Sequence, residues 1–211
     1  MQPVQPMSTD IMAAHDWSTN GHLIWDLVRL GYLHAEDYTL DTTYGRGVWW
    51  KLWQPKRLLT NGWTDDPSQP PTDTVRDFSD LDYPDNHFDT VAFDPPYMPK
   101  GTPAGLKAMD ERYGVGNQSP RFLAALMADG LTECARVTTG GGTILTKAGR
   151  GIVGGKLWRG DDLLVSHGEA LGLEVIAQFR HLTRPRSQAH RGPQKSPRSN
   201  YSTLTVWRKP T

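Results

Sequence analysis

The sequence VAFDPPYMPKG, residues 91–101, places an apolar run directly before an acid, two prolines and an aromatic residue. Because proline lacks the backbone donor that a sheet ladder needs, these prolines cannot lie inside a central strand. The apolar run FDTVAF, residues 88–93, is therefore predicted to be a central parallel strand that ends just before Asp94. The two prolines then stiffen the turn that follows, and they fix the direction of its carbonyl groups.

Strand and helix patterns alternate along the rest of the chain, which is typical of an α/β domain with a mostly parallel sheet. The last two strands have no helix between them, so we expect them to pair antiparallel at one edge of the sheet. The strands are predicted at 38–40, 56–63, 73–78, 88–93, 142–147, 173–182 and 201–209, and helices over 18–31, 47–55, 119–139 and 161–172.

The composition describes one ordinary globular domain. The chain has 211 residues, 37% of them hydrophobic and 22% charged. Its single cysteine, Cys134, excludes an internal disulfide and a cysteine-based zinc site, and the histidines show no paired metal-ligand spacing. We expect no metal, no membrane span and no signal peptide, and therefore a cytoplasmic protein. Residues 1–17 are predicted to be a flexible arm before a domain at 18–211.

The charges are distributed unevenly, although the formal net charge is +0. No Asp or Glu follows Glu174, whereas the loop 183–200 is rich in Arg and Lys. This asymmetry predicts a local basic face for phosphate groups, and a solvated tail is the alternative of equal weight. The basic residues of the loop are Arg184, Arg186, Arg191, Lys195 and Arg198.

The segment LDTTYGRG, residues 40–47, follows the first predicted strand, at the sheet edge where open α/β sheets bind ligands. Its glycines fit neither the dinucleotide signature nor the P-loop. A D-x-x-x-G-x-G loop suits a nucleoside without a pyrophosphate, such as S-adenosylmethionine, whose cationic methionine end would face the acid. An ordinary turn is the alternative. The candidate cofactor residues here are Asp41, Thr43, Tyr44, Gly45 and Gly47.

Acids also follow the next two predicted strands. Asp65 or Asp66 would accept hydrogen bonds from a ribose diol. Asp77 would accept from an adenine amino group, and Phe78 would flank the ring. Each acid alone is equally explained as turn chemistry. Three successive strand ends with acids in register favour a shared nucleoside site.

The stretch Asp94-Pro95-Pro96-Tyr97 has the chemistry to hold an amino group. The Asp94 carboxylate and the Pro95 carbonyl are two acceptors, which match the two N–H donors of an exocyclic amine. Tyr97 supplies a face on which an extruded base can stack, worth about 1–3 kcal/mol. The prolines lower the cost of arranging these groups.

The DPPY tetrad behind an upstream DTTYGRG loop resembles the class I S-adenosylmethionine-dependent amino-methyltransferases of DNA, which modify adenine N6 or cytosine N4. The resemblance covers residues 18–209, and the tail is similar to that of small phage-type methylases. It implies a single-domain, Rossmann-like class I methyltransferase fold with a seven-stranded sheet, a bacterial or phage source, and adenine N6 as the target. Many relatives have D-P-F in place of Asp41-Thr42-Thr43.

The resemblance implies DNA contacts in the loop 98–118 and the region 147–160, in addition to the basic loop 183–200. Cytosine N4, an RNA guanine amine, a protein glutamine amide and a non-catalytic nucleic-acid-binding subunit remain alternatives. Asp94 disfavours the glutamine target, and the intact tetrad disfavours a non-catalytic role. No nuclease motif is visible, so a restriction or recognition subunit would be a separate chain. The further candidate DNA-binding residues are Lys100, Lys107, Lys147 and Lys156.

Overall fold

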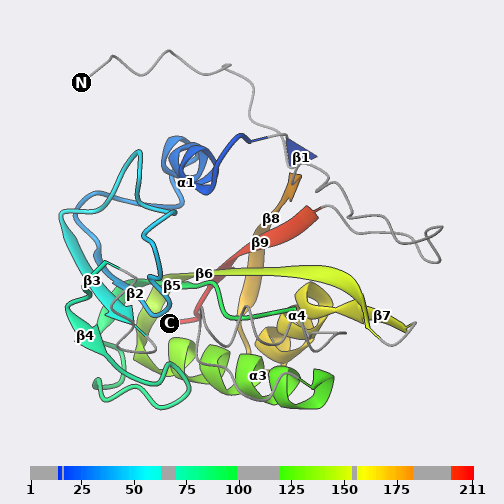
Figure 1. Cartoon of the computed structure of the whole chain (residues 1–211). Coiled ribbons are helices and arrows are strands. Elements are labelled where there is room, and N and C mark those ends of the chain that lie inside the picture. Colours follow the sequence, from blue (N-terminus) through cyan, green and yellow to red (C-terminus); the bar gives the residue numbers. More distant parts are fainter. Residues whose placement is uncertain (1–13, 16, 63–69, 99–118, 154–155, 183–200) are drawn as a thin grey trace.

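A single twisted sheet runs through the computed structural model, which describes residues 14–15, 17–62, 70–98, 119–153, 156–182 and 201–211. The strand order is β4-β3-β2-β5-β6-β9-β8-β1, and β7 pairs with β6 off this path (Figure 1). The strands are β1 (Ala14–His15), β2 (Tyr38–Asp41), β3 (Arg57–Gly62), β4 (Thr74–Val75), β5 (Phe88–Phe93), β6 (Thr138–Val153), β7 (Lys156–Arg159), β8 (Glu174–Leu182) and β9 (Tyr201–Arg208).

The strands from β4 to β6 are parallel to their neighbours, whereas β9 runs antiparallel to both β6 and β8. The seven predicted strands are all present, and the antiparallel pairing of the last two is confirmed. Two short strands were not predicted: β1, which adds to the edge of β8, and β7, which forms a hairpin with the extended end of β6. The fold is a class I methyltransferase-like α/β sheet.

Helices cover both faces of the sheet (Figure 1). Helix α1 (Asn20–Arg29) lies on one face, and α3 (Pro120–Val137) and α4 (Gly160–Ala170) lie on the other. Helix α1 begins after Thr19, whose side chain accepts from the His22 N–H, and α3 begins after Ser119, with Pro120 at its first turn. Both helices begin within two residues of the starts predicted from the sequence, 18 and 119.

Two apolar clusters form the core, one on each side of the sheet. The first joins α3 and α4 to the strands through Phe88, Val91, Met127 and Trp207. The second joins α1 to the opposite face and includes Trp17, Leu27, Trp49 and Trp50. Burial between layers fixes β2 and β5 in the centre, so their carboxyl ends meet at one place.

The predicted helix over residues 47–55 is wrong, because this segment folds as turns and bends. Gly47 has a left-handed φ of 62°, and the backbone N–H of Trp50 donates to its carbonyl over 3.2 Å. Trp49 and Trp50 are both buried although they are consecutive. A helix would turn their side chains about 100° apart, whereas the turns bring both indoles to the strand ends.

Other element boundaries also differ from the prediction. Helix α3 ends at Val137, and the glycines 140–142 lie within β6 instead of ending the helix. The strand predicted at 73–78 is reduced to Thr74–Val75. Ala14–His15 already pairs with β8, so the sheet begins inside the predicted arm. Within the described residues, no helix is long and apolar enough to cross a membrane.

Candidate active site

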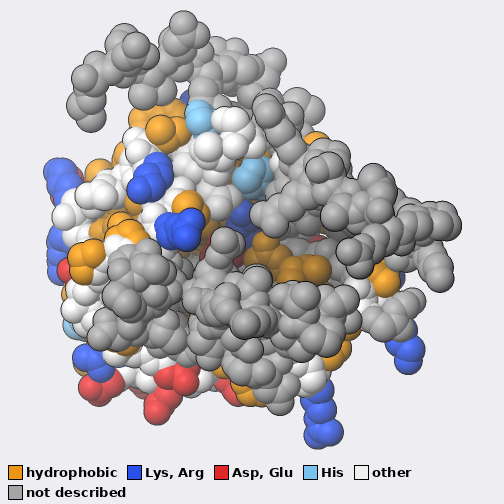
Figure 2. Space-filling view, in the orientation of Figure 1, with side chains coloured by type: hydrophobic (Ala, Val, Ile, Leu, Met, Phe, Trp, Pro, Cys, Tyr) orange, Lys and Arg blue, Asp and Glu red, His pale blue; other side chains and the backbone are white. Residues whose placement is uncertain are grey.

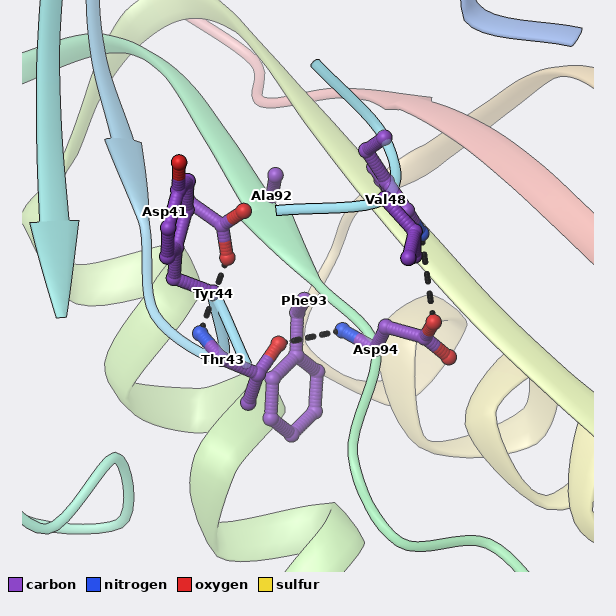
Figure 3. Close-up of a pocket in the computed structure, with 8 residues that line it drawn as sticks. Asp41, Thr43, Tyr44, Val48, Ala92, Phe93 and Asp94 are labelled. Atoms are coloured by element: carbon purple, nitrogen blue, oxygen red, sulfur yellow. Dashed lines mark hydrogen bonds between the residues drawn. The ribbon is translucent and has the colours of Figure 1, made fainter. Parts of the chain in front are cut away.

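The ends of β2 and β5 bring two acids to one pocket. Strands β2 and β5 are parallel neighbours, with Asp41 paired to Ala92 and Asp94 two residues beyond. Figure 3 shows both carboxylates beside the loop that follows β2. The sequence predicted Asp41 for the cofactor and Asp94 for the target, and the fold places them side by side. The residues that line the pocket are Asp41, Thr43, Tyr44, Val48, Trp49, Ala92, Phe93 and Asp94.

Thr43 connects the two acids directly. Its backbone N–H donates to Asp41 Oδ1 over 2.9 Å, and its hydroxyl accepts from the backbone N–H of Asp94 over 2.7 Å (Figure 3). One loop residue therefore holds the Asp41 side chain and the start of the DPPY turn.

Two adjacent tryptophans donate hydrogen bonds to the two acids. The indole N–H of Trp50 donates to Asp41 Oδ2 over 2.6 Å, and that of Trp49 donates to Asp94 Oδ2 over 3.1 Å. Both rings are nearly inaccessible, at 6% and 4% exposure. A buried indole N–H needs an acceptor, and here each acceptor is a carboxylate.

Burial dominates the electrostatics of both acids. It raises the pKa of Asp41 to about 7, against the hydrogen bonds from Trp50 and Thr43, and the Asp94 charge raises it further. Burial also raises the pKa of Asp94, while the Lys147 charge and the Trp49 hydrogen bond lower it. The pocket is therefore an environment in which negative charge is costly until a positive ligand arrives.

The loop after β2 depends on its glycines. Gly45 and Gly47 have φ of 52° and 62°, a region that side chains rarely adopt. The Gly47 N–H donates to the Tyr44 carbonyl over 2.8 Å, and a β-carbon on Gly47 would lie 2.6 Å from the Tyr44 hydroxyl. These contacts define a tight turn that brings backbone close to the pocket.

The remaining residues of the tetrad pack against β6 and β7. Pro95 is buried and Pro96 is half-buried. The Tyr97 ring lies so close to Gly149 that a β-carbon there would be 2.9 Å from its Cε2 atom. The indole N–H of Trp158 donates to the Tyr97 carbonyl over 2.6 Å. This arrangement fixes the backbone beyond the prolines.

Lys147 lies inside the protein at 5% exposure, whereas the sequence predicted it to contact phosphate. Its ammonium donates to the Asn20 side chain and lies 3.5 Å from His181 Nδ1. Burial lowers the pKa of Lys147, and the Asp94 charge raises it. The structure thus places this cation among the groups behind the tetrad.

Four of the predicted cofactor residues, Gly45, Gly47, Asp77 and Phe78, are not among the residues that line the pocket. Asp77 accepts hydrogen bonds from the N–H and hydroxyl of Ser79, an ordinary turn arrangement. Phe78 is fully buried, and its ring packs against Phe93 at a centroid distance of 5.3 Å. Asp65 and Asp66 lie outside the described residues, so their role stays a prediction.

Lys156, on β7, is the exposed member of the predicted DNA-binding set within the described residues. On the face shown in Figure 2, acidic side chains gather along one edge, and basic ones are spread among apolar residues. The other predicted phosphate contacts lie outside the described residues: Lys100, Lys107, Arg184, Arg186, Arg191, Lys195 and Arg198.

The candidate site residues predicted from the sequence did not include Trp49 and Trp50. Both lie in the core, but each also donates to an acid of the pocket. The available signal was the need of a buried indole for an acceptor, beside a segment already predicted to carry the two acids. Among the described residues, no group of three or more His, Cys, Asp or Glu side chains is placed to hold a metal.

No family model matches the chain, and no curated protein matches its sequence. Solved structures do share its fold. A candidate methyltransferase from Bacillus halodurans C-125 covers 90% of this chain and 100% of its own length, with 14% identity and a TM-score of 0.55. The N-methyltransferase NodS from Bradyrhizobium japonicum WM9 covers 90% and 96%, with 14% identity and a TM-score of 0.54.

A candidate DNA modification methylase from Thermus thermophilus, crystallised with S-adenosyl-L-methionine, is more distant. The chain aligns over 65% of its own length and spans about half of that protein (54%), with 16% identity and a TM-score of 0.44. This likeness is too weak to bear on function. The two stronger matches establish the fold alone: the chain has the class I methyltransferase fold.

Proposed function

We propose that this protein is an S-adenosylmethionine-dependent DNA methyltransferase that acts on an exocyclic amino group, adenine N6. The observation that carries the proposal is the placement of Asp94, at the start of a DPPY turn, beside Asp41 in one pocket. A cofactor acid and a target acid must be neighbours, because the methyl group passes directly between their ligands.

The pocket is suited to a cationic nucleoside. Asp41 is a buried acid whose pKa is raised to about 7, so a positive ligand gains by stabilising its ionised form. The glycine turn lets a ligand approach the loop backbone closely. S-adenosylmethionine fits this donor set, with Asp41, Thr43 and the glycines below its methionine part. Bound there, it would supply a methyl group on a positively charged sulfur.

The residues of the tetrad act on the other reactant. Asp94 and the Pro95 carbonyl would accept the two N–H bonds of the amine, which directs its nitrogen lone pair toward the cofactor site. The nitrogen gains the methyl group and loses one proton, and the Asp94 carboxylate is placed to receive that proton. The raised pKa of Asp94 favours such a transfer.

No covalent enzyme intermediate is needed for this chemistry. Cys134 lies fully buried in α3, and burial raises the pKa of its thiol above the ordinary range. A thiol in that state is a poor nucleophile. The reaction would therefore be a direct in-line transfer, as a nitrogen nucleophile allows.

The target base must leave the duplex, because its amine cannot reach the pocket while stacked. Tyr97 would stack on the flipped ring, with its backbone held through Trp158. Phosphate contacts from the basic loop 183–200 and from Lys156 would position the duplex without reading its sequence.

The test is to incubate the protein with tritiated cofactor and unmethylated DNA or RNA, and to identify the modified nucleoside by mass spectrometry. The proposal predicts N6-methyladenine in DNA. A product of N4-methylcytosine, or label confined to RNA, would keep the amino-methyltransferase class and replace the target. A product of 5-methylcytosine, or no transfer to either polymer, would contradict the proposal.

A further inference from the structure

We propose that Trp49 and Trp50 are paired positioning residues: Trp50 orients Asp41 at the cofactor site, and Trp49 orients Asp94 at the target site. The assignment of the two sites rests on the proposed function. The hydrogen bonds themselves do not, since Trp50 Nε1 lies 2.6 Å from Asp41 Oδ2 and Trp49 Nε1 lies 3.1 Å from Asp94 Oδ2.

The turn at Gly47 allows the two tryptophans to contact different acids. Its backbone accepts from the Trp50 N–H and donates to Tyr44, so the chain reverses just before the two tryptophans. Their rings lie 6.4 Å apart with an interplanar angle of 52°. The two indole N–H groups can therefore reach carboxylates on different strands, which consecutive residues of a helix would not do.

The two acids differ in how many of their carboxylate oxygens accept hydrogen bonds. Asp41 has both oxygens occupied, Oδ1 by the Thr43 N–H and Oδ2 by Trp50. Asp94 has Oδ2 occupied by Trp49, and within the described part of the chain its Oδ1 makes no hydrogen bond. Trp49 thus fixes the carboxylate plane and leaves one oxygen for an incoming N–H. An acid with one free oxygen suits an amine that also bonds to the Pro95 carbonyl.

An indole suits this role, because it donates one hydrogen bond, accepts none and carries no charge. It holds a carboxylate without neutralising it, unlike Arg or Lys. Among the described residues, each acid faces the other, Lys147 on β6 acts on Asp94, and the Cys134 thiol on α3 lies near Asp41. Loss of an indole donor is therefore expected to change mainly the pKa of the acid that this indole contacts.

The simpler reading is that both tryptophans only fill the core. Trp53 offers a matched control for that reading. It belongs to the same segment and is half-buried, and its ring lies 6.3 Å from that of Trp50. Among the residues that the structure describes, no carboxylate accepts a hydrogen bond from Trp53. Trp53→Phe therefore removes an indole from the cluster without removing a donor to either acid.

The experiment is a carboxyl carbon NMR titration of the full-length protein labelled at aspartate, with Asp41→Asn and Asp94→Asn identifying the two signals. Trp49→Phe should raise the pKa of Asp94 by roughly one unit, the scale of one lost hydrogen bond to a charged group. Trp50→Phe should do the same to Asp41. The cross effects, through the mutual charge of the acids, should be smaller, and Trp53→Phe should move neither signal.

Cofactor affinity and methyl-transfer rate then separate the two roles. Trp50→Phe should weaken the binding of S-adenosylmethionine about tenfold and shift its pH dependence upward. Trp49→Phe should leave that affinity within about twofold and should lower the transfer rate about tenfold or more. Equal effects of both variants on both quantities would mean that the tryptophans act through packing alone and would overturn the proposal.

A second pair of variants guards against a loss of folding. Replacement of either tryptophan by benzothienylalanine, through codon suppression, keeps the bicyclic ring and removes only the N–H. If these variants titrate as the wild type does, the proposal is wrong. The NMR titration needs no substrate, so a protein that fails to methylate DNA but shows the paired pKa shifts would refute the proposed function and leave the positioning pairs intact.

Discussion

Asp41 of the pocket and Asp161 in the first turn of α4 are buried to similar extents, yet they have different hydrogen-bond partners. Asp161 is 6% exposed, and Arg150 Nε lies 2.8 Å from each of its oxygens, with Thr203 donating a further bond. Asp41 is 5% exposed, and among the described residues only neutral N–H groups donate to it. A buried charge without a cation is costly, and this cost is the cause of the raised pKa of Asp41.

Asp26, another buried acid of the described chain, can be compared with Asp41 in the same way. It accepts from the Trp17 indole over 2.9 Å, much as Asp41 accepts from Trp50. It also pairs with Arg29 over 3.1 Å. A hydrogen bond from an indole therefore does not by itself distinguish an acid of a binding site from an acid with a structural role. The difference is that, within the described residues, no cation pairs with Asp41, which lies at the sheet edge where α/β folds bind their ligands.

The largest expected effect on catalysis is at Asp94. Asp94→Ala should lose at least about 2–3 kcal/mol of transition-state stabilisation, the scale of one preorganised polar contact, while cofactor still binds. Asp94→Asn should retain some activity, because an amide oxygen still accepts a hydrogen bond. The measurement is the single-turnover methylation rate on unmethylated DNA. A wild-type rate for Asp94→Ala would show that the tetrad acid has no part in the reaction.

A stability experiment tests whether Asp41 and Asp161 differ as the structure indicates. The folded pKa of Asp41 is raised from 3.8 to about 7, so between these values the folded state holds more protons than the unfolded state. Its contribution to stability is thus greatest at low pH and falls as pH rises through this window, by up to about 4 kcal/mol. Asp41→Asn should remove this loss and stabilise the free protein at pH 8.

Asp161→Asn is the matched control and should have the opposite sign. It leaves Arg150 without its buried partner and should destabilise the protein by about 1–3 kcal/mol. Urea denaturation of both variants and the wild type at two pH values measures the difference. If Asp41→Asn and Asp161→Asn are destabilising to the same degree at pH 8, the two acids are equivalent structural groups.

A smaller effect is expected at Tyr97, whose role is stacking. Tyr97→Phe should stay active, because the ring survives, whereas Tyr97→Ala should lose about 1–3 kcal/mol of base stacking. The Michaelis constant for DNA, measured with both variants beside the wild type, checks this. A loss in Tyr97→Phe equal to that in Tyr97→Ala would assign the function to the hydroxyl instead of the ring.

The sequence was sufficient for seven of the strands and for the meeting of Asp41 with Asp94, because alternating strands and helices bring parallel strand ends to one edge of the sheet. It was insufficient for Trp49 and Trp50, since helical spacing outweighed the breaking effect of Gly47 in the prediction. It also misjudged the surroundings of Lys147, because a lysine at a strand end looks exposed until the neighbouring Asn20 and His181 are known. Contacts between distant segments leave no local pattern.

The most direct measurement is the calorimetric affinity for S-adenosylmethionine from pH 5.5 to pH 8.5, in the wild type and in Asp41→Ala. Ionised Asp41 is the form that attracts the cationic ligand, so the wild-type affinity should rise about tenfold per pH unit below about pH 7 and level off above it. Asp41→Ala should abolish binding throughout. An Asp41→Ala protein that binds as tightly as the wild type, with no dependence on pH, would contradict the assignment of this pocket to the cofactor.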